Sequence, residues 1–209
     1  MTLSVQSYLE QRALWPHTGQ HILAQFDDNS VVVYQAYRAS IARHAVDHQQ
    51  FGGDFSYSRM SWIKPNFLWM MFRSGWAAKE GQEHILAVRL HRAFFDEVLD
   101  AAVASTFRAS GFHGHDEWKS AVAISDVRLQ WDPDHDPLGA CVPRRAVQLG
   151  LRGETLRRYG QEAVLSIEDI TPFVLEQRAR LHGGLNTLQT PVERLYPRST
   201  ASSGSTAGF

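Results

Sequence analysis

The sequence predicts an α+β fold, in which strands and helices are interleaved without regular alternation. Hydrophobic periodicity identifies four or five candidate strands between helical segments. The last two of these strands are separated by a loop-rich segment, and that spacing disfavours regular βαβ winding. An apolar content of 44% and a charged content of 21% are ordinary for a chain with a packed core. With 209 residues the chain suits one domain, which we place at residues 1–198.

The N-terminal part predicts a helix, a strand and a second helix, in that order. An amphipathic helix lies within the first thirty residues and breaks near Pro16. Residues 31–37 are mainly β-branched or aromatic, which makes them the strongest strand candidate in the chain. Ser40 is expected to cap a helix over residues 41–50, which two glycines then end.

The middle of the chain predicts a buried helix over residues 66–78, preceded by a short strand over residues 60–63. Residues 67–72 are apolar without interruption, so this helix has no polar side to turn toward water. We therefore expect it to be central, with Trp69 and Met70 almost fully buried. A small mixed or antiparallel sheet should pack around it.

The C-terminal part contains further strands and helices and then a polar tail. Strand-like alternation is present in residues 86–91, 127–131 and 147–151. Helices are predicted over residues 93–107, 154–158, 161–166 and 172–181. Residues 199–209 contain mainly Ser, Thr, Ala and Gly, and we expect them to form a disordered tail.

The composition limits the classes of protein to which the chain can belong. The formal net charge is −1, so no overall field attracts the chain to nucleic acid or to an anionic membrane. Cys141 is the only cysteine, which leaves no intrachain disulfide and fits a reducing cytoplasm. The first residues lack the features of a signal peptide, and the longest apolar run is too short to span a bilayer. We expect a soluble, cytoplasmic protein with no membrane partner.

Residues 59–76 carry the strongest candidate site. They combine three tryptophans with Arg59, Lys64 and Arg73. Tryptophan offers a flat face on which a base or a nicotinamide ring stacks, so Trp62 is a candidate for such a contact. Arginine and lysine donate hydrogen bonds to phosphates, and the combination suits a nucleotide. The alternative is that the apolar residues form core and the charges only mark its rim.

The strand over residues 31–37 contributes two polar candidates. Gln35 and Tyr37 point to the same face of this strand, because side chains alternate along it. If Gln35 is buried among its apolar neighbours, its amide needs hydrogen-bonding partners. It is therefore either a ligand contact or a satisfied structural amide, and the strand alone leaves both interpretations open.

Two later segments add further candidates. Residues 130–137 contain three alternating aspartates, but Pro137 stands where a calcium loop needs glycine, so a solvated loop is predicted. Asp132, next to the strand, is the member of this loop best placed to contact a cofactor. A basic cluster follows, formed by Arg144, Arg145, Arg152, Arg157 and Arg158. It is either a solvated face or a phosphate contact, and Arg145 and the strand residue Gln148 are best placed for the second role.

Motifs for metals and for common cofactors are missing. His44 and His48 lie four residues apart on a helix and residues 113–116 form a second histidine group, but neither is a complete zinc site. We therefore predict no metal. The sequence also lacks a Walker loop, the G-x-G-x-x-G pattern and the G-x-S-x-G elbow. Cys141 has no histidine partner that the sequence identifies.

Several stretches together resemble one family, domain-of-unknown-function family 4291. The segment R-M-S-W-I-K-P-N-F-L-W-M-M-F-R-S-G-W at residues 59–76 is the most specific of them. The similarity extends over most of the chain and leaves the tail outside. Family members tend to have a basic residue where this chain has Leu23, so a phosphate contact there would be absent. The other stretches are residues 32–38, 130–133 and 145–151.

Residues 34–37 and the helix that begins at Ile41 resemble the first strand and helix of the ADP-ribosyltransferases. Those enzymes open with a strand of the type Y-H-x-T, whose polar residue contacts the adenosine ribose of NAD. Gln35 stands at the position of that histidine, and no glutamate occupies a recognisable catalytic position. The related RNA 2′-phosphotransferases work mainly with arginines and a histidine. The resemblance implies NAD as a substrate and an ADP-ribosyltransferase-like fold.

These observations lead to three hypotheses. The first is an NAD-dependent ADP-ribosyltransferase-like enzyme acting on a nucleic acid (RNA or DNA) or a protein. In it Arg59, Lys64 and Arg145 hold the diphosphate, Tyr37 or Trp62 lies against a ring, and Gln35 contacts a ribose. The second is a non-catalytic module that binds RNA or a nucleotide, and the third is a hydrolase or nuclease centred on Asp132. A nucleotide site requires one pocket lined by Gln35, Arg59, Trp62, Lys64, Arg145 and Gln148.

Overall fold

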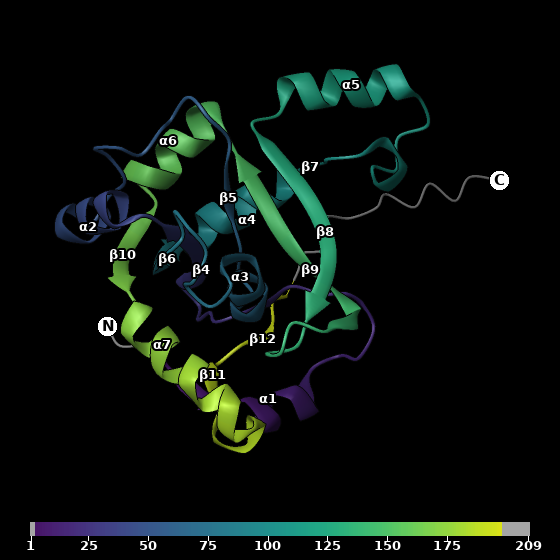
Figure 1. Ribbon diagram of the computed structural model, residues 1–209. Helices are drawn as coiled ribbons and strands as arrows, with labels where there is room; N and C mark the ends of the chain where they lie inside the picture. The colour runs from purple at the N-terminus through teal and green to yellow at the C-terminus, as the bar shows by residue number, and fades with distance from the viewer. Residues whose placement is uncertain (1–2, 198–209) are drawn as a thin grey trace.

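Three antiparallel strands form the sheet that organises the molecule. The computed structural model describes residues 3–197 and gives this sheet the order β10–β6–β4 (Figure 1). Its strands are β4 (Ser30–Tyr37), β6 (His84–His91) and β10 (Val164–Asp169). Strand β4 pairs with β6 along its whole length, from Ser30 opposite His91 to Tyr37 opposite His84.

A second sheet is built around a long antiparallel hairpin. The hairpin consists of β8 (Val127–His135) and β9 (Cys141–Leu151). Short strands extend it, namely β2 (Gly19–Gln20), β5 (Ser61–Ile63) and β7 (Val103–Ala104). The two sheets are joined where Tyr34 and Lys64 exchange backbone hydrogen bonds of 2.7 and 3.3 Å. This junction places the end of β4 beside β5, where the candidate site lies.

Helices and short strand pairs surround the two sheets. The α-helices are α1 (Tyr8–Leu14), α2 (Ala39–His48), α3 (Phe67–Ser74), α4 (Arg92–Asp100), α5 (His115–Ile124), α6 (Gly153–Gln161) and α7 (Thr171–Arg180). Single 3-10 turns are η1 (Phe107–Ala109), η2 (Leu181–Gly183) and η3 (Leu185–Thr187). Near the two ends of the chain, β1 (Val5–Ser7) pairs with β11 (Gln189–Pro191), and β3 (Leu23–Ala24) with β12 (Arg194–Leu195).

Strand β4 of the first sheet is buried on both of its faces, and that explains its run of apolar residues. Val31 and Val33 belong to a core cluster shared with the apolar face of the β8–β9 hairpin. Val32 and Tyr34 belong to a second cluster, shared with helices α1, α3 and α7. Because side chains alternate along a strand, a run such as Val31–Tyr34 fills both clusters at once.

Helix α3 lies near the centre of the molecule, as predicted (Figure 1). Trp69 is 7% exposed and Met70 is 3% exposed, which confirms the predicted burial of both side chains. The helix is not apolar on every side, however, because Phe72 is 44% exposed and stacks on His135 of β8. It also ends earlier than predicted, since Gly75 with φ of 60° closes it in the left-handed conformation.

Residues far from α3 in the sequence help to hold its N-terminus. The Asn66 side chain caps the helix by accepting a 2.7 Å hydrogen bond from the Trp69 amide. Glu193, 3% exposed, accepts hydrogen bonds from the Phe67 amide at 2.5 Å and from Asn66 Nδ2 at 3.1 Å. The Glu193 amide in turn donates to Gln11 of α1 at 2.8 Å. Burial raises the pKa of Glu193 well above its usual value, which the Phe67 amide partly opposes.

Several predicted elements differ in the structure. Residues 161–166, predicted as a helix, end α6 and begin strand β10. The helix predicted over residues 93–107 is the shorter α4, which ends at Asp100. Ser40 does not cap α2, because it lies inside the helix and Arg38 occupies the N-cap position. Residues 132–135 are not a solvated loop but continue β8, and helix α5 was not predicted.

The fold is α+β, as the sequence predicts, with helices set around separate sheets rather than alternating with parallel strands. Within residues 3–197, no helix combines the length and the apolarity that crossing a membrane would require. The predicted disordered tail at residues 199–209 lies outside the described residues.

Candidate functional site

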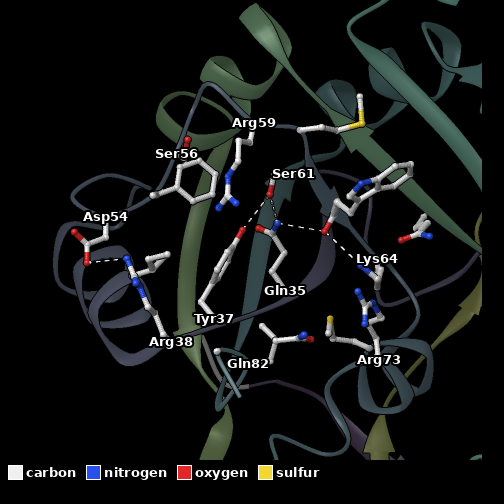
Figure 2. Close-up of a pocket in the computed structure, with 18 of the residues that line it drawn as sticks. Gln35, Tyr37, Arg38, Asp54, Ser56, Arg59, Ser61, Lys64, Arg73 and Gln82 are labelled. Atoms are coloured by element: carbon white, nitrogen blue, oxygen red, sulfur yellow. Dashed lines mark hydrogen bonds and ion pairs between the residues drawn. The ribbon is translucent and has the colours of Figure 1, made fainter. Parts of the chain in front are cut away.

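A cavity of about 800 Å³ opens where β4, β5 and the β8–β9 hairpin meet (Figure 2). The end of β4 contributes Gln35 and Tyr37, and β5 with the loop before it contributes Arg59, Ser61 and Trp62. Further lining residues include Arg38, Asp54, Ser56, Lys64, Met70, Arg73, Gln82, Gln130 and Gln148. Segments that are distant in the sequence therefore line one cavity.

The cavity is strongly basic. Arg59 and Arg73 line it and have no ion-pair or hydrogen-bond partner for their guanidinium groups among the described residues. In Figure 2 the guanidinium of Arg59 points toward the hydroxyls of Tyr37 and Ser61. Asp54 is the only acidic side chain among the described lining residues, and it is exposed and paired with Arg38 at 3.2 Å. The cavity therefore has a surplus of positive charge that would attract an anion.

Lys64 is the most perturbed of these cations. It is only 5% exposed, and its ammonium makes a single long hydrogen bond of 3.5 Å to the Trp62 carbonyl. Burial, and to a smaller extent the nearby charge of Arg73, lower the pKa of Lys64 to about 8, although the charge of Asp132 opposes the shift. Its backbone pairing with Tyr34 fixes it in this place. A buried ammonium with one weak partner in a cavity indicates a binding site for an anion.

A hydrogen-bond network fixes the floor of the cavity. The Gln35 amide nitrogen donates to Ser61 Oγ at 2.8 Å and to the Trp62 carbonyl at 3.3 Å. Its amide oxygen accepts a 2.6 Å bond from the hydroxyl of Tyr159, a buried residue of α6. The Tyr37 hydroxyl lies 3.1 Å from Ser61 Oγ, and burial raises the pKa of Tyr37. Gln35 is thus a satisfied amide that positions Ser61, the outcome that the strand pattern left open.

Trp62 lies flat against β9 because the facing residue is a glycine. A Cβ atom on Gly150 would stand 3.0 Å from the Trp62 ring and 2.6 Å from the Met60 sulfur, closer than side chains tolerate. Gly150 is opposite Trp62 in the pairing of β5 with β9. The half-buried indole is thereby held at the edge of the cavity.

Two amides that share one carboxylate line the cavity at the β8–β9 hairpin. Gln130 of β8 and Gln148 of β9 face each other across the hairpin. Asp132 accepts a 2.7 Å hydrogen bond from the Gln130 amide nitrogen and a 2.6 Å bond from that of Gln148. The two glutamines line the cavity, and Asp132 lies behind them.

The structure brings together most of the candidate residues. Seven of them line the cavity, namely Gln35, Tyr37, Arg59, Trp62, Lys64, Arg73 and Gln148. Asp132 contacts the cavity only through Gln130 and Gln148. Arg145 does not join them, because it lies three positions before Gln148 on β9 and therefore points from the other face of the strand. Whether the assembled residues act as the sequence suggests stays a prediction.

The basic cluster after residue 143 is largely neutralised within the protein. Arg144 is buried and pairs with Asp134 at 2.5 Å. The other members pair with acidic side chains too, apart from Arg145: Arg152 with Asp126, Arg157 with Glu154 and Glu162, and Arg158 with Glu97. A phosphate-binding role for the cluster is therefore not supported by its geometry.

Sequence reasoning missed four contributors to the site. Ser61 and Gln130 belong to predicted strands, and their polar side chains within apolar runs were the available signal. Tyr159 reaches Gln35 from a helix 124 residues away, and nothing in the local sequence indicates that contact. Arg38 immediately follows β4, so its position beside the cavity follows from the strand end.

The thiol of Cys141 has a histidine partner, contrary to the sequence interpretation. Its sulfur lies 3.4 Å from Nε2 of His135, because the two residues are paired across the β8–β9 hairpin. Burial lowers the pKa of His135, which lies under Phe72 and Trp69. Within the described part of the chain, no group of three or more His, Cys, Asp or Glu side chains is placed to hold a metal ion.

The fold and the cavity define an α+β protein with one large, basic, polar pocket between two sheets. Residues 21–196 match the family described as Domain of unknown function (DUF4291), and the chain belongs to that family. Among curated proteins, none matches the chain.

Proposed function

We propose that the protein binds NAD in this cavity and transfers its ADP-ribose unit to a nucleic acid or a protein acceptor. The observation that carries the proposal is the buried ammonium of Lys64, which shares the cavity with the unpaired guanidinium groups of Arg59 and Arg73. A diphosphate supplies the negative charge that these three cations lack within the described protein. The cavity volume of about 800 Å³ lies within the usual range of cofactor and small-molecule sites.

The cavity residues suit the parts of a dinucleotide. Arg59, Lys64 and Arg73 would hold the diphosphate, and the indole of Trp62 or the ring of Tyr37 would lie against a planar ring. Because the Gln35 amide is used within the protein, we assign it to holding Ser61 rather than to a direct ribose contact. The likeness of β4 and α2 to the first strand and helix of ADP-ribosyltransferases favours this substrate.

The proposed reaction depends mainly on positioning and electrostatics. The bond between the ribose C1′ and the nicotinamide nitrogen breaks, the electron pair leaves with nicotinamide, and the acceptor oxygen or nitrogen bonds to C1′ and loses its proton. A cavity that fixes the diphosphate and the ring restricts the ribose between them, which favours the oxocarbenium-like transition state.

Incubation with NAD tests the activity. The protein should release nicotinamide when RNA, DNA or a protein extract is supplied, and labelled ADP-ribose should appear on one of the three acceptors. Lys64→Met should lose both signals, whereas Arg180→Ala, which changes an exposed arginine paired with Glu176, should retain them. If NAD binds but none of the acceptors is modified and no nicotinamide appears, the catalytic part of the proposal is wrong.

A non-catalytic nucleotide- or RNA-binding module is the second candidate. It is favoured by one observation: Asp54 is the only carboxylate among the described lining residues, and it is engaged with Arg38. A glutamate of the kind that assists ADP-ribosyl transfer is therefore missing from the wall. A hydrolase centred on Asp132 is less favoured, because both of its carboxylate oxygens accept hydrogen bonds from glutamine amides.

The affinity for NAD should depend on pH through Lys64. The pKa of Lys64 is lowered to about 8, so the side chain is charged below pH 8 and loses its proton above it. The diphosphate of NAD keeps its charge throughout this range. The dissociation constant, measured by calorimetry from pH 7 to pH 9.5, should rise above pH 8 and approach a tenfold increase per pH unit. Lys64→Arg should bind with a flat profile, and an equally flat profile for the wild type would exclude Lys64 from the contact.

A further inference from the structure

The hydrogen bonds to Asp132 determine which end of the Gln130 and Gln148 amides faces that carboxylate. The nitrogen and oxygen of a glutamine amide are ordinarily hard to tell apart, and the hydrogen-bond network must decide between them. At Gln130 and Gln148 the partner is the carboxylate of Asp132, which can only accept hydrogen bonds when ionised. Both amide nitrogens must therefore face Asp132, at 2.7 and 2.6 Å.

This orientation leaves two carbonyl oxygens available to a ligand. No described residue donates a hydrogen bond to the amide oxygen of Gln130 or Gln148, and both side chains line the cavity. Each amide nitrogen keeps a second hydrogen, but that nitrogen is held at Asp132, whereas the oxygen is the free end of the group. The wall of the cavity at the β8–β9 hairpin is therefore predominantly a hydrogen-bond acceptor.

A flat apolar surface lies beside these acceptors. Gln148 and Gly150 are two residues apart on β9 and share one face of the strand. The Trp62 ring packs directly on Gly150, as the 3.0 Å approach to its Cβ position shows. An aromatic face next to fixed acceptors is the arrangement that recognises a planar ring with a donor group at its edge.

We propose that Gln130 and Gln148, oriented by Asp132, select a ligand that has an NH2 group on a planar ring lying against Trp62. Two parts of NAD have this chemistry, the amino group of adenine and the carboxamide of nicotinamide. This recognition rests on the proposed nucleotide function, and the NH2 group is the part of the nucleotide that the site recognises. Asp132 is a positioning residue here, and the two glutamines determine specificity.

The physical basis for selectivity is that the amides resist rotation. A ring that has a carbonyl or carboxylate in place of the NH2 group would bring its own oxygen against the amide oxygens of Gln130 and Gln148. Turning a glutamine to offer its NH2 would place its oxygen against Asp132, which repels it. A site built to accept a hydrogen bond therefore rejects an analogue that cannot donate one more strongly than an apolar site would.

Two pairs of nucleotides test the proposal and separate the two sources of the NH2 group. ADP and inosine 5′-diphosphate differ at the purine, where an amino group is replaced by a carbonyl. NAD and nicotinic acid adenine dinucleotide differ at the other ring, where the carboxamide is replaced by a carboxylate. Calorimetric titration of the full chain should show a preference of about tenfold or more for the NH2-bearing member of one pair.

Variants then show whether the glutamines cause the preference. Gln148→Met removes one acceptor at similar length, and Asp132→Asn allows an amide to turn, so both should reduce the preference to about threefold or less. Gln82→Met is the matched control, because Gln82 lines the same cavity but has no carboxylate that fixes its amide. It should keep the wild-type preference. The ratio within a pair is the readout. ADP and inosine 5′-diphosphate carry the same charge, so the changed charge near Lys64 in Asp132→Asn cancels within that pair. The members of the NAD pair differ by one charge, so Gln148→Met, which leaves the charge of the site unchanged, is the readout there.

The possible results are distinct. A wild type that binds both members of each pair equally overturns the inference and leaves the nucleotide site intact. A preference that survives in Gln148→Met and Asp132→Asn also overturns it. Binding of pyrophosphate without any effect of the base restricts the site to phosphates and likewise overturns it. If neither pyrophosphate nor any nucleotide binds to wild type, the proposed function itself fails.

Discussion

Lys64→Met should weaken NAD binding by about 10- to 100-fold and at the same time make the ligand-free protein more stable. Loss of a charge-assisted contact to a phosphate costs about 1.5–3 kcal/mol of binding free energy. The unfolded chain hydrates the Lys64 ammonium, whereas the folded protein leaves it 5% exposed with one 3.5 Å hydrogen bond. Methionine fills a similar volume without this cost. Calorimetric titration and thermal unfolding measure the two effects on the same samples.

The gain in stability has a defined sign and pH range. The pKa of Lys64 is lowered from 10.5 to about 8, so folding costs free energy while the unfolded chain holds the proton. At neutral pH this cost is about 3 kcal/mol, since one pKa unit corresponds to about 1.4 kcal/mol. This cost applies fully below pH 8 and disappears as the pH rises to 10.5, the pKa of lysine in the unfolded chain. The melting temperatures of Lys64→Met and wild type should therefore differ most below pH 8 and converge above pH 10.

Arg59 provides the comparison. It lies on the same cavity but is exposed, so Arg59→Ala should reduce NAD affinity while leaving the unfolding free energy within about 0.5 kcal/mol of wild type. Arg180→Ala, outside the cavity, should change neither quantity. A Lys64→Met protein that melts below wild type and still binds NAD would show that Lys64 is a structural cation.

Trp69→Ala should destabilise the fold by about 3–5 kcal/mol, the usual cost of truncating a buried aromatic side chain. Trp69 is 7% exposed, and its ring stacks with those of Phe72 and His135 at centroid distances of 5.4 and 5.3 Å. These contacts hold α3 against β8. Chemical unfolding by urea, followed by circular dichroism, gives the difference directly.

Trp69→Phe is the matched variant. The indole Nε1 has no hydrogen-bond partner among the described residues, so phenylalanine loses no hydrogen bond and keeps part of the stacking. It should cost clearly less than alanine. Because Met70 and Arg73 of α3 line the cavity, the alanine variant should also lose NAD affinity. Unfolding of Trp69→Ala at the wild-type urea concentration would refute the role of Trp69 in the core.

The parts of the site that the sequence predicts are those with strong local signals. Arg59, Trp62 and Lys64 stand within six residues of one another, so a short strand is enough to place them on one cavity. Gln35 is notable as a polar residue in an apolar strand. Its partners could not be predicted, because Tyr159 reaches it from α6 and the pairing depends on how distant segments pack.

The errors in the fold also have physical causes. The first residues of β10, 164–166, are predicted as the end of a helix, and the structure shows a shift in register between Val164 and Ser166 that interrupts the alternation typical of a strand. Residues 132–135 are predicted as a loop because their alternating aspartates resemble an incomplete calcium loop, but the structure continues β8 through Pro133. The register shift after Pro133 accommodates it, and the buried pair of Asp134 with Arg144 continues the hairpin.

The clamp on α3 by Glu193 has a consequence for how the protein is made on the ribosome. The helix that carries Arg73 is synthesised well before Glu193, whose carboxylate binds the Phe67 amide at its N-terminus. Domains synthesised N-terminal end first often begin to fold during elongation, but this partner of the helix is synthesised 126 residues after Phe67. The cavity should therefore reach its final shape only after residue 193 has emerged from the ribosome, so a nascent chain halted before that residue should not retain NAD.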